Sequence, residues 1–326
     1  MTMFRIEDFY TQYGKPLELE LFSGKEGLIK KIRKPEVQRP GLSLAGHLKN
    51  FTSARIFVFG KNEIEYLREM TSECRKERLS KIFTEDTPAV IVARRYRPPS
   101  ELAAICRKLH IPLFRSKMNT MALIGKIILL LNDTFSPSVL LHGTLVEVFG
   151  VGVLIQGESS VGKSEAALSL LDGGHRLIAD DVVRIKKKEG NFLIGEGPKL
   201  TRHMMEIRGI GIINVAQLYG AVCVRLDKTI ELVVKLELWD EHHFYDRVGL
   251  EEKFYDILGV QVPFHVLPLK PGRDVKLLIE TICLNHRLKA SGYHSAKEFN
   301  RKLLEKILSK EKKSTRIGKD NKQDRD

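Results

Sequence analysis

Residues 157–164 spell Gly-Glu-Ser-Ser-Val-Gly-Lys-Ser, a complete G-x-x-x-x-G-K-[ST] phosphate-binding loop. The apolar stretch 145–155 before the loop predicts a strand, and residues 165–171 after it predict a helix that stops at Gly173. A strand, a loop and a helix in this order gather backbone N–H groups around an anion at the N-terminus of the helix. The segment therefore predicts an α/β fold built around a phosphate site.

The side chains of the loop suggest a nucleotide with a divalent cation. Lys163 is placed to reach the β- and γ-phosphates, and the Ser164 hydroxyl is placed to ligate Mg²⁺. Backbone N–H groups around the phosphates would come from the rest of the loop, which is Gly157, Glu158, Ser159, Ser160, Val161 and Gly162. The alternative is a chance match in a glycine-containing turn, which the two correct flanks disfavour.

The composition is that of a soluble globular protein, with 43% hydrophobic and 29% charged residues in a chain of 326. This length suits two domains, each able to bury its own core. The four cysteines are far apart and have no metal-ligand spacing, which indicates free thiols in a reducing cytosol. We find no signal-peptide pattern, and the longest apolar run, 121–131, contains Lys126 and is too short to span a bilayer. We therefore expect a cytoplasmic protein without a membrane partner.

The net charge of +13 raises the question of nucleic-acid binding. Part of that charge lies in residues 301–326, where ten Lys and Arg face five Asp and Glu. No basic-aromatic motif of a nucleic-acid module accompanies the rest, so we do not expect nucleic acid as a partner. A solvated basic surface is the preferred interpretation, and attraction of an acidic partner or of phosphorylated ligands is the alternative.

The segment before residue 135 predicts a small N-terminal α/β domain, 1–134, whose role stays open. Two short β-rich runs, 55–59 and 89–93, are bounded by turn residues. Helical spacing or capping signals mark three segments: 62–83, 101–109 behind the N-cap Ser100, and 119–131. We find no catalytic cluster in this part of the chain.

The polar, proline-containing segment 132–138 predicts the start of a second domain, 135–308. Its last part, 298–308, has the apolar spacing of an amphipathic helix. Residues 309–326 are almost purely charged and polar, so we expect a disordered basic tail there.

Two adjacent carboxylates, Asp180 and Asp181, interrupt an otherwise apolar strand pattern at 175–185. Successive strand side chains point to opposite faces, so these two carboxylates should have different roles. One would face the phosphates as a base or metal partner. The alternative is a turn, or a salt bridge with Arg176 or Arg184.

A third element is the segment 205–214, which predicts a strand or a turn with bulge-forming glycines. Glu206 and Arg208 are two residues apart, so they would share a face of an extended chain. A carboxylate and a guanidinium projecting together suit a magnesium–phosphate site.

Taken together, these motifs resemble those of the bacterial HPr kinase/phosphorylase family. The matching segments occur in order along the second half of the chain: 141–143, 157–165, 174–181, 206–213, 246–250 and 271–273. The E-I-R-G-x-G-I-I block at 206–213 is the most specific of them, whereas the N-terminal half resembles the family in layout only. The resemblance implies that the second domain is a P-loop kinase domain similar to phosphoenolpyruvate carboxykinase.

The resemblance also implies an activity and partners. Such a protein is a Mg²⁺-dependent serine kinase that phosphorylates HPr, the phosphocarrier of the sugar phosphotransferase system, with ATP or pyrophosphate. Many members also phosphorolyse phosphoserine-HPr to pyrophosphate, and the family forms hexamers. Two other interpretations stay open: a P-loop kinase that acts on a small molecule, and a non-catalytic nucleotide-sensing regulator.

Residue roles follow from the same resemblance. Lys163 and the loop would hold the phosphates, and Ser164 and Glu206 would bind Mg²⁺. Asp180 would accept the proton of the substrate serine.

His142 and Arg247 would complete the catalytic set, with Arg247 suited to charge on the transferring phosphoryl group. Four further side chains would support the site: Asp181, Arg208, Lys270 and Arg273.

This chain departs from the usual family pattern at several positions. Ser160 stands where glycine is usual, which restricts the backbone if a positive φ is required. Lys270 and Asp274 stand where arginine and asparagine are commoner, in a loop associated with phosphorolysis. Lysine cannot form a planar bidentate contact with phosphate, so the kinase activity is better supported than the phosphorylase activity.

Overall fold

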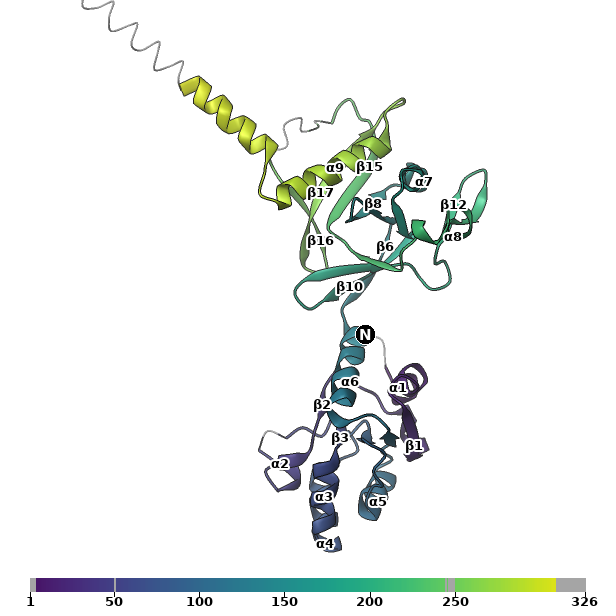
Figure 1. The fold of residues 1–326 in the computed structure, drawn as a ribbon, viewed down its shortest axis with the longest axis vertical. Helices are drawn as coiled ribbons and strands as arrows, with labels where there is room; N and C mark the ends of the chain where they lie inside the picture. Colours follow the sequence, from purple (N-terminus) through teal and green to yellow (C-terminus); the bar gives the residue numbers. More distant parts are fainter. Residues whose placement is uncertain (1–3, 50, 244, 246–249, 309–326) are drawn as a thin grey trace, which may run out of the picture. The chain divides into compact units, whose positions relative to one another are not determined.

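The computed structural model describes residues 4–49, 51–243, 245 and 250–308. The chain divides between Ser136 and Pro137 into two compact units (Figure 1). The predicted boundary lies two residues earlier, inside a helix, because helix α6 (Thr120–Phe135) continues into the polar segment 132–138, where we expected the second domain to start. No helix of the described residues is long and apolar enough to cross a membrane.

The N-terminal unit is built on a five-stranded sheet in the order β1-β5-β4-β3-β2. Strands β2 to β5 run parallel and β1 pairs with β5 antiparallel at one edge. The strands are β1 (Leu19–Ser23), β2 (Val37–Gln38), β3 (Ile56–Phe59), β4 (Val90–Val92) and β5 (Leu113–Ser116). Every residue of β3 and β4 is buried, as expected for parallel strands covered on both faces.

Two hydrophobic clusters in this unit contain alternate residues of those central strands, one cluster for each face. The covering helices are α1 (Ile6–Tyr13), the 3₁₀ helix η1 (Lys25–Ile29), α2 (Gly41–Leu44), α3 (Lys61–Glu69), α4 (Ser72–Ile82), α5 (Ser100–Lys108) and α6. The prediction of one helix over 62–83 was wrong. Met70 is extended, and the Thr71 side chain accepts a hydrogen bond from the Cys74 N–H as the N-cap of a new helix.

The C-terminal unit contains a six-stranded sheet in the order β16-β17-β15-β8-β7-β9. Its strands are β7 (Thr144–Val148), β8 (Val151–Gly157), β9 (Arg176–Ala179), β15 (Leu232–Leu238), β16 (Lys253–Ile257) and β17 (Val260–Leu269). A four-stranded sheet consists of β6 (Ser138–His142), β10 (Val182–Lys188), β11 (Phe192–Glu196) and β14 (Asp227–Thr229). A separate hairpin joins β12 (Met204–Ile207) and β13 (Gly211–Asn214).

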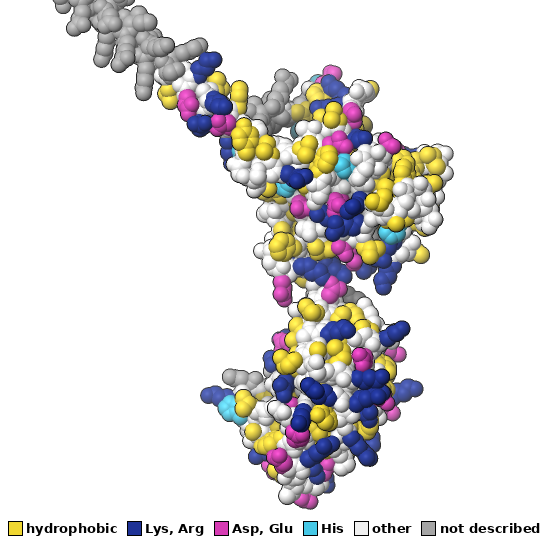
Figure 2. Space-filling model, viewed as in Figure 1, with side chains coloured by type: hydrophobic (Ala, Val, Ile, Leu, Met, Phe, Trp, Pro, Cys, Tyr) yellow, Lys and Arg dark blue, Asp and Glu magenta, His cyan; other side chains and the backbone are white. Residues whose placement is uncertain are grey.

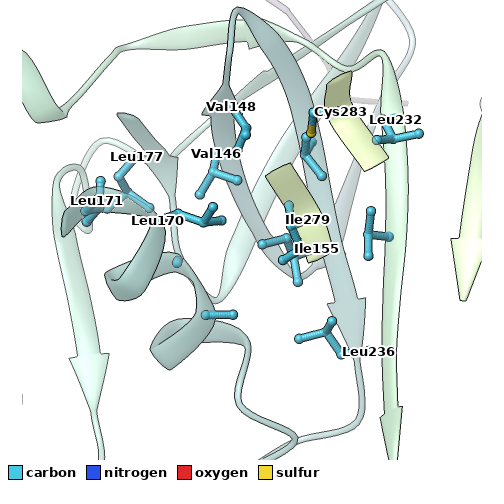
Figure 3. Close-up of a cluster of buried hydrophobic side chains, with 14 of the residues drawn as sticks. Val146, Val148, Ile155, Leu170, Leu171, Leu177, Leu232, Leu236, Ile279 and Cys283 are labelled. Atoms are coloured by element: carbon cyan, nitrogen blue, oxygen red, sulfur yellow. The ribbon is translucent and has the colours of Figure 1, made fainter. Parts of the chain in front are cut away.

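Helices cover one face of the six-stranded sheet. Leu170 from α7 (Lys163–Asp172) and Ile279 from α9 (Val275–Ala290) pack on strand residues such as Ile155 in one buried cluster (Figure 3). A second cluster, containing Leu154 and Val183, joins the six-stranded sheet to the four-stranded one. The short helices α8 (Val215–Leu218) and η2 (Ala221–Cys223) follow β13, and residues 295–308 are helical, as predicted for 298–308.

The stretch 145–155, expected to be one strand, is a hairpin of β7 and β8. Phe149 and Gly150 form its turn, and both have positive φ, of 49° and 82°. A two-residue turn of this kind suits tightly paired strands. Phenylalanine is rare in such a turn, and both strands are mostly buried, so the apolar sequence runs on without an obvious break.

The strand directions place several loops at one edge of the six-stranded sheet. Strands β8, β15 and β17 are mutually parallel, and β9 points the same way because β8 and β9 are both antiparallel to β7. Their carboxyl ends lead into the 157–164 loop, Trp239, Lys270 and Asp180. In open α/β sheets, ligands bind at the carboxyl ends of the strands.

Candidate active site

The 157–164 loop leaves β8 in a conformation that needs glycine at its start. Gly157 has a φ of 148°, and a Cβ there would lie 2.5 Å from the Leu236 carbonyl oxygen. Gly162, at the N-cap of α7, has a φ of 101°. The loop therefore ends directly at the N-terminus of a ten-residue helix, where N–H groups are free to meet an anion.

Lys163 is folded back over this loop. Its Nζ donates hydrogen bonds to the carbonyl oxygens of Gly157, at 3.0 Å, and Glu158, at 2.8 Å. The ammonium is thus held against the loop backbone by two hydrogen bonds to neutral carbonyl oxygens. It can leave both carbonyls for a phosphate, which offers a stronger charge-assisted bond.

Asp180 lies at the centre of the site and is buried. Its carboxylate accepts a hydrogen bond from the Thr144 hydroxyl at 2.7 Å and from the Ser164 hydroxyl at 3.1–3.2 Å. Burial raises the pKa of Asp180, and the bonds from Thr144 and Ser164 oppose that rise. The backbone N–H groups of Glu206 and Asp181 are close enough to lower the pKa of this carboxyl.

Asp181 differs from Asp180 in its exposure and in its contacts. It is exposed and has a φ of 65°, and its carboxylate lies 3.6 Å from His142 Nδ1. We expected the two aspartates on opposite faces of one strand, but neither belongs to a strand. β9 ends at Ala179, in the six-stranded sheet, and β10 begins at Val182, in the four-stranded sheet, so the pair occupies the crossing between sheets.

Glu206 reaches the site on strand β12. Met205 and Ile207, on either side of it, are buried in the cluster that contains the α7 side chains, so Glu206 points the other way and is exposed. Its backbone N–H lowers the pKa of Asp180, so Glu206 lies beside the buried carboxylate. The shared face expected for Glu206 and Arg208 was wrong, because the strand ends at Ile207 and Arg208 lies in the hairpin turn.

The loop after β17 has its own contacts. Lys270 Nζ lies 3.5 Å from the centre of the Trp239 ring, and Arg273 donates to the Pro268 carbonyl oxygen at 2.8 Å. The Asp274 carboxylate caps α9 by accepting a hydrogen bond from the Leu277 N–H at 3.0 Å. Trp239 follows β15, so cation and ring come from the ends of neighbouring parallel strands.

The structure thus brings together Lys163, Ser164, Asp180 and Glu206. His142 contacts Asp181 rather than Asp180, and Arg247 lies outside the described residues, as does the tail 309–326. Lys270 and Arg273 make no hydrogen bond or ion pair with the 157–164 loop within the described residues.

Our sequence reasoning missed Thr144 and Trp239. A lone threonine at the start of an apolar run has no motif that marks it. Trp239 is the only tryptophan of the chain, which could have drawn attention to it.

A magnesium ion would find few protein ligands here. No group of three or more His, Cys, Asp or Glu side chains suited to a metal occurs within the described residues. Mg²⁺ commonly uses one or two protein oxygens and takes the rest from phosphates and water. The Ser164 hydroxyl and the neighbouring carboxylates fit that pattern, provided that a polyphosphate is bound.

Ser160 provides a direct test of loop strain. Its φ of 71° is left-handed, a conformation that costs an L-residue about 1–2 kcal/mol and glycine nothing. Since glycine also loses about 0.5–1 kcal/mol more entropy on folding, Ser160→Gly should stabilise the protein by about 1 kcal/mol or less in urea unfolding. Ser159→Gly, at a neighbouring position without positive φ, should be neutral or destabilising. Equal effects of the two changes would contradict the strain.

Comparison with known proteins shows which family models match this chain. The model of the HPr serine kinase C-terminal domain matches residues 133–303, and that of the HPr serine kinase N terminus matches residues 4–131. The N-terminal match extends the likeness to the part of the chain that resembled the family only in layout.

Two curated relatives align over nearly the whole chain. An HPr kinase/phosphorylase of Brevibacillus brevis is 42% identical over 290 residues, which is 89% of this chain and 93% of the relative. The HPr kinase/phosphorylase of Geobacillus kaustophilus is 40% identical over 307 residues, 94% of this chain and 97% of its own length. A solved Hpr(Ser) kinase/phosphatase from Coxiella burnetii, 39% identical, aligns with 49% of this chain and 98% of its own at a TM-score of 0.45.

Proposed function

The chain belongs to the HPr serine kinase family, and from that premise we propose that it transfers a phosphoryl group from ATP or pyrophosphate to a serine of HPr. We also propose the reverse reaction, phosphorolysis of phosphoserine-HPr to pyrophosphate. The observation that carries the proposal is Asp180, a buried carboxylate bonded to the loop residue Ser164. Phosphoryl transfer needs such a group beside the phosphate site to guide the attacking hydroxyl.

In this mechanism the residues of the C-terminal unit have separate tasks. The loop N–H groups and Lys163 hold the phosphates, while the Thr144 hydroxyl keeps the Asp180 carboxylate in place. Asp180 takes the proton of the substrate serine in the kinase direction and returns it in phosphorolysis. Mg²⁺, held by Ser164 and Glu206 together with the phosphates, would supply positive charge against the phosphate oxygens.

Finer features belong to the same proposal. We assign the C-terminal unit to the P-loop kinases that resemble phosphoenolpyruvate carboxykinase, and we assign the protein a homo-hexameric assembly. His142 and Arg247 complete the catalytic set, and Asp181, Arg208, Lys270 and Arg273 support it. Asp181 would do so through His142, which lies 3.6 Å away.

The decisive experiment is incubation with purified HPr, Mg²⁺ and either ATP or pyrophosphate, followed by intact-mass measurement of HPr. We expect the mass of one added phosphoryl group, and no addition to an HPr variant whose acceptor serine is alanine. ATP turnover without transfer to HPr would instead favour a small-molecule kinase. Nucleotide binding without any turnover would favour a regulator.

The loop after β17 predicts the balance between the two directions. Lys270→Arg combined with Asp274→Asn should raise the ratio of phosphorolysis to kinase rate about tenfold, which corresponds to about 1.4 kcal/mol. The reason is that arginine can bind phosphate through two parallel hydrogen bonds. Both replacements suit the structure, since arginine also stacks on aromatic rings and asparagine is as good an N-cap as aspartate. Rates in both directions are measured for the double and the two single variants. An unchanged ratio would exclude this loop from control of direction.

A further inference from the structure

Trp239 contacts a cation of the proposed site, although the proposed reaction gives this ring no role. The Lys270 ammonium lies 3.5 Å from the centre of the Trp239 ring. Lysine carries its charge on a long, flexible side chain, and Lys270 is exposed, so the position of the charge depends on its partners. In the part of the chain that the structure describes, that ammonium has no hydrogen bond or ion pair, and the ring is the partner that it has.

The two backbone segments that carry this contact are fixed to each other. Trp239 follows β15 and Lys270 follows β17, and the last pair of these parallel strands joins Leu238 to Leu269. The Trp239 N–H donates to the Leu269 carbonyl oxygen at 3.0 Å. The Lys270 carbonyl oxygen accepts from the Arg273 N–H at 3.1 Å, which closes the turn after β17. The pairing of the strands thus places the ring beside the Lys270 side chain.

The same sheet leads to the phosphate loop. β15 lies between β17 and β8, and Leu236 of β15 pairs with Gly157, the first residue of the loop. Trp239 and Lys270 directly follow the carboxyl ends of β15 and β17. Ligands of open α/β sheets bind at this edge, so the cation lies at the edge of the sheet where the phosphates would bind.

A ring face can hold an ammonium without occupying its N–H groups. The attraction is that of a positive charge for the electron-rich face of the ring, and it needs no hydrogen bond. A lysine ammonium has three N–H donors, so those directed away from the ring stay available to a phosphate oxygen. The ring and an anion therefore do not compete for Lys270, and the ring reduces the rotamer freedom that this side chain would lose on binding.

Other charges on this unit do not replace a positioned cation. Figure 2 shows Lys and Arg side chains scattered over the C-terminal unit, with Asp and Glu side chains among them. Exposed charges of both signs offset each other, and salt screens them beyond about 8 Å. An anion at the edge of the sheet therefore gains most from a cation that is held in contact with it.

We propose that Trp239 is a positioning residue, which holds the Lys270 ammonium in place for the inorganic phosphate that attacks in phosphorolysis. This inference rests on the proposed function. The kinase direction uses a neutral serine hydroxyl as the nucleophile, whereas phosphorolysis uses an anion. The positioned cation therefore matters more for phosphorolysis.

The step itself is a transfer between two oxygens. An oxygen of the inorganic phosphate forms a bond to the phosphorus of phosphoserine as the bond from that phosphorus to the serine oxygen breaks. The serine oxygen takes its proton from protonated Asp180, and the products are pyrophosphate and the serine hydroxyl. Lys270 offsets negative charge on the attacking phosphate and neither gives nor takes a proton.

The test compares two replacements of the ring in the full chain. Trp239→Leu keeps apolar bulk but removes the ring face, and should raise the KM for inorganic phosphate about fivefold, which corresponds to about 1 kcal/mol. The kcat should change less, because the ammonium binds phosphate in the ground state and in the transition state alike. Trp239→Phe keeps a ring face and should restore most of the affinity. Phe192→Leu removes an exposed ring from β11, outside the six-stranded sheet, and should leave this KM unchanged.

A double-mutant cycle shows whether the ring acts through Lys270. Lys270→Met keeps the length of the side chain without its charge, and should raise the same KM at least about fivefold, since it removes a charge-assisted bond. Adding Trp239→Leu to this variant should raise the KM no further, because the ring would have no ammonium left to position. Additive effects of the two changes, or an unchanged KM in Trp239→Leu, would overturn the proposal.

The fluorescence of the single tryptophan gives a measurement that needs neither HPr nor turnover. Inorganic phosphate is titrated into the full chain with Mg²⁺ present, and we expect a saturable change in Trp239 emission, with a midpoint at least about fivefold higher in Lys270→Met. Lys270 is exposed, so this variant should fold even where a change of the ring does not. No emission change, or the same midpoint in both proteins, would sink the inference. A shifted midpoint in a protein that transfers nothing to or from HPr would instead overturn the proposed function alone.

Discussion

Lys163→Ala is expected to abolish phosphoryl transfer in both directions, with a loss of at least about 10²–10³-fold in rate. ATP, pyrophosphate and attacking phosphate must all use the same loop, and Lys163 is its one side-chain cation. The structure keeps that ammonium within 3.0 Å of two loop carbonyl oxygens, so it lies against the loop proposed to hold the phosphates. Its removal leaves the negative charge of a transferring phosphoryl group without its nearest counter-charge.

The fold should survive this change. Lys163 is the first residue of α7, its two bonds go to partly exposed carbonyls that water can satisfy, and alanine is a good helix former. Circular dichroism and the urea midpoint check folding, and transfer to and from HPr is measured by intact mass. Lys253→Ala, which removes an exposed cation from β16, serves as the matched control and should keep both activities. A Lys163 variant that loses only one direction would show that the loop is not shared.

The part of the site that sequence predicted well is local along the chain. The 157–164 loop and its following helix each depend on a few neighbouring residues, whose backbone requirements are readable. The carboxylate pair at 180–181 was expected within one strand but lies between β9 and β10. The hairpin turn at Phe149–Gly150 was missed because buried strands carry continuous apolar sequence. Periodicity alone cannot show where such a run reverses.

The sequence could not predict contacts between neighbouring strands of the sheet. Thr144 bonds to Asp180 because β7 and β9 are neighbours, and Lys270 stacks on Trp239 because β15 and β17 are neighbours. Strand order decides both contacts. Asp274 illustrates the same limit: the sequence showed it only as a departure from the commoner asparagine, whereas its carboxylate caps helix α9.

Asp180→Asn should lower the chemical rate by about two to four powers of ten, the usual loss when a general base is removed. Asparagine keeps the size of the side chain and one acceptor for the Thr144 hydroxyl, but it cannot take a proton. Nucleotide affinity should change little, because the loop N–H groups and Lys163 remain. Single-turnover kinetics with HPr, together with nucleotide titration, separates the two quantities.

The stability of the same variant provides an internal check. Burial raises the pKa of Asp180, so the folded protein resists ionising this group more than the unfolded chain does. The carboxyl therefore lowers the free energy of unfolding once the pH exceeds the pKa that it has in the unfolded chain. This destabilisation persists at neutral pH. A neutral asparagine removes that cost while losing an acceptor for Ser164, so the urea midpoint should shift little. A lower rate with an unchanged urea midpoint would then show that the chemical step itself is impaired.

Asp181→Asn is the matched control, because it makes the same chemical change at the adjacent residue. Asp181 is exposed, contacts only His142 among side chains at 3.6 Å within the described residues, and has a left-handed φ that asparagine tolerates well. It should therefore keep most of the chemical rate, and any defect should appear in metal use or stability. If Asp180→Asn transferred phosphate at the wild-type rate, the buried carboxylate would not be the base, and the hydroxyl would have to be activated by a group outside this cluster.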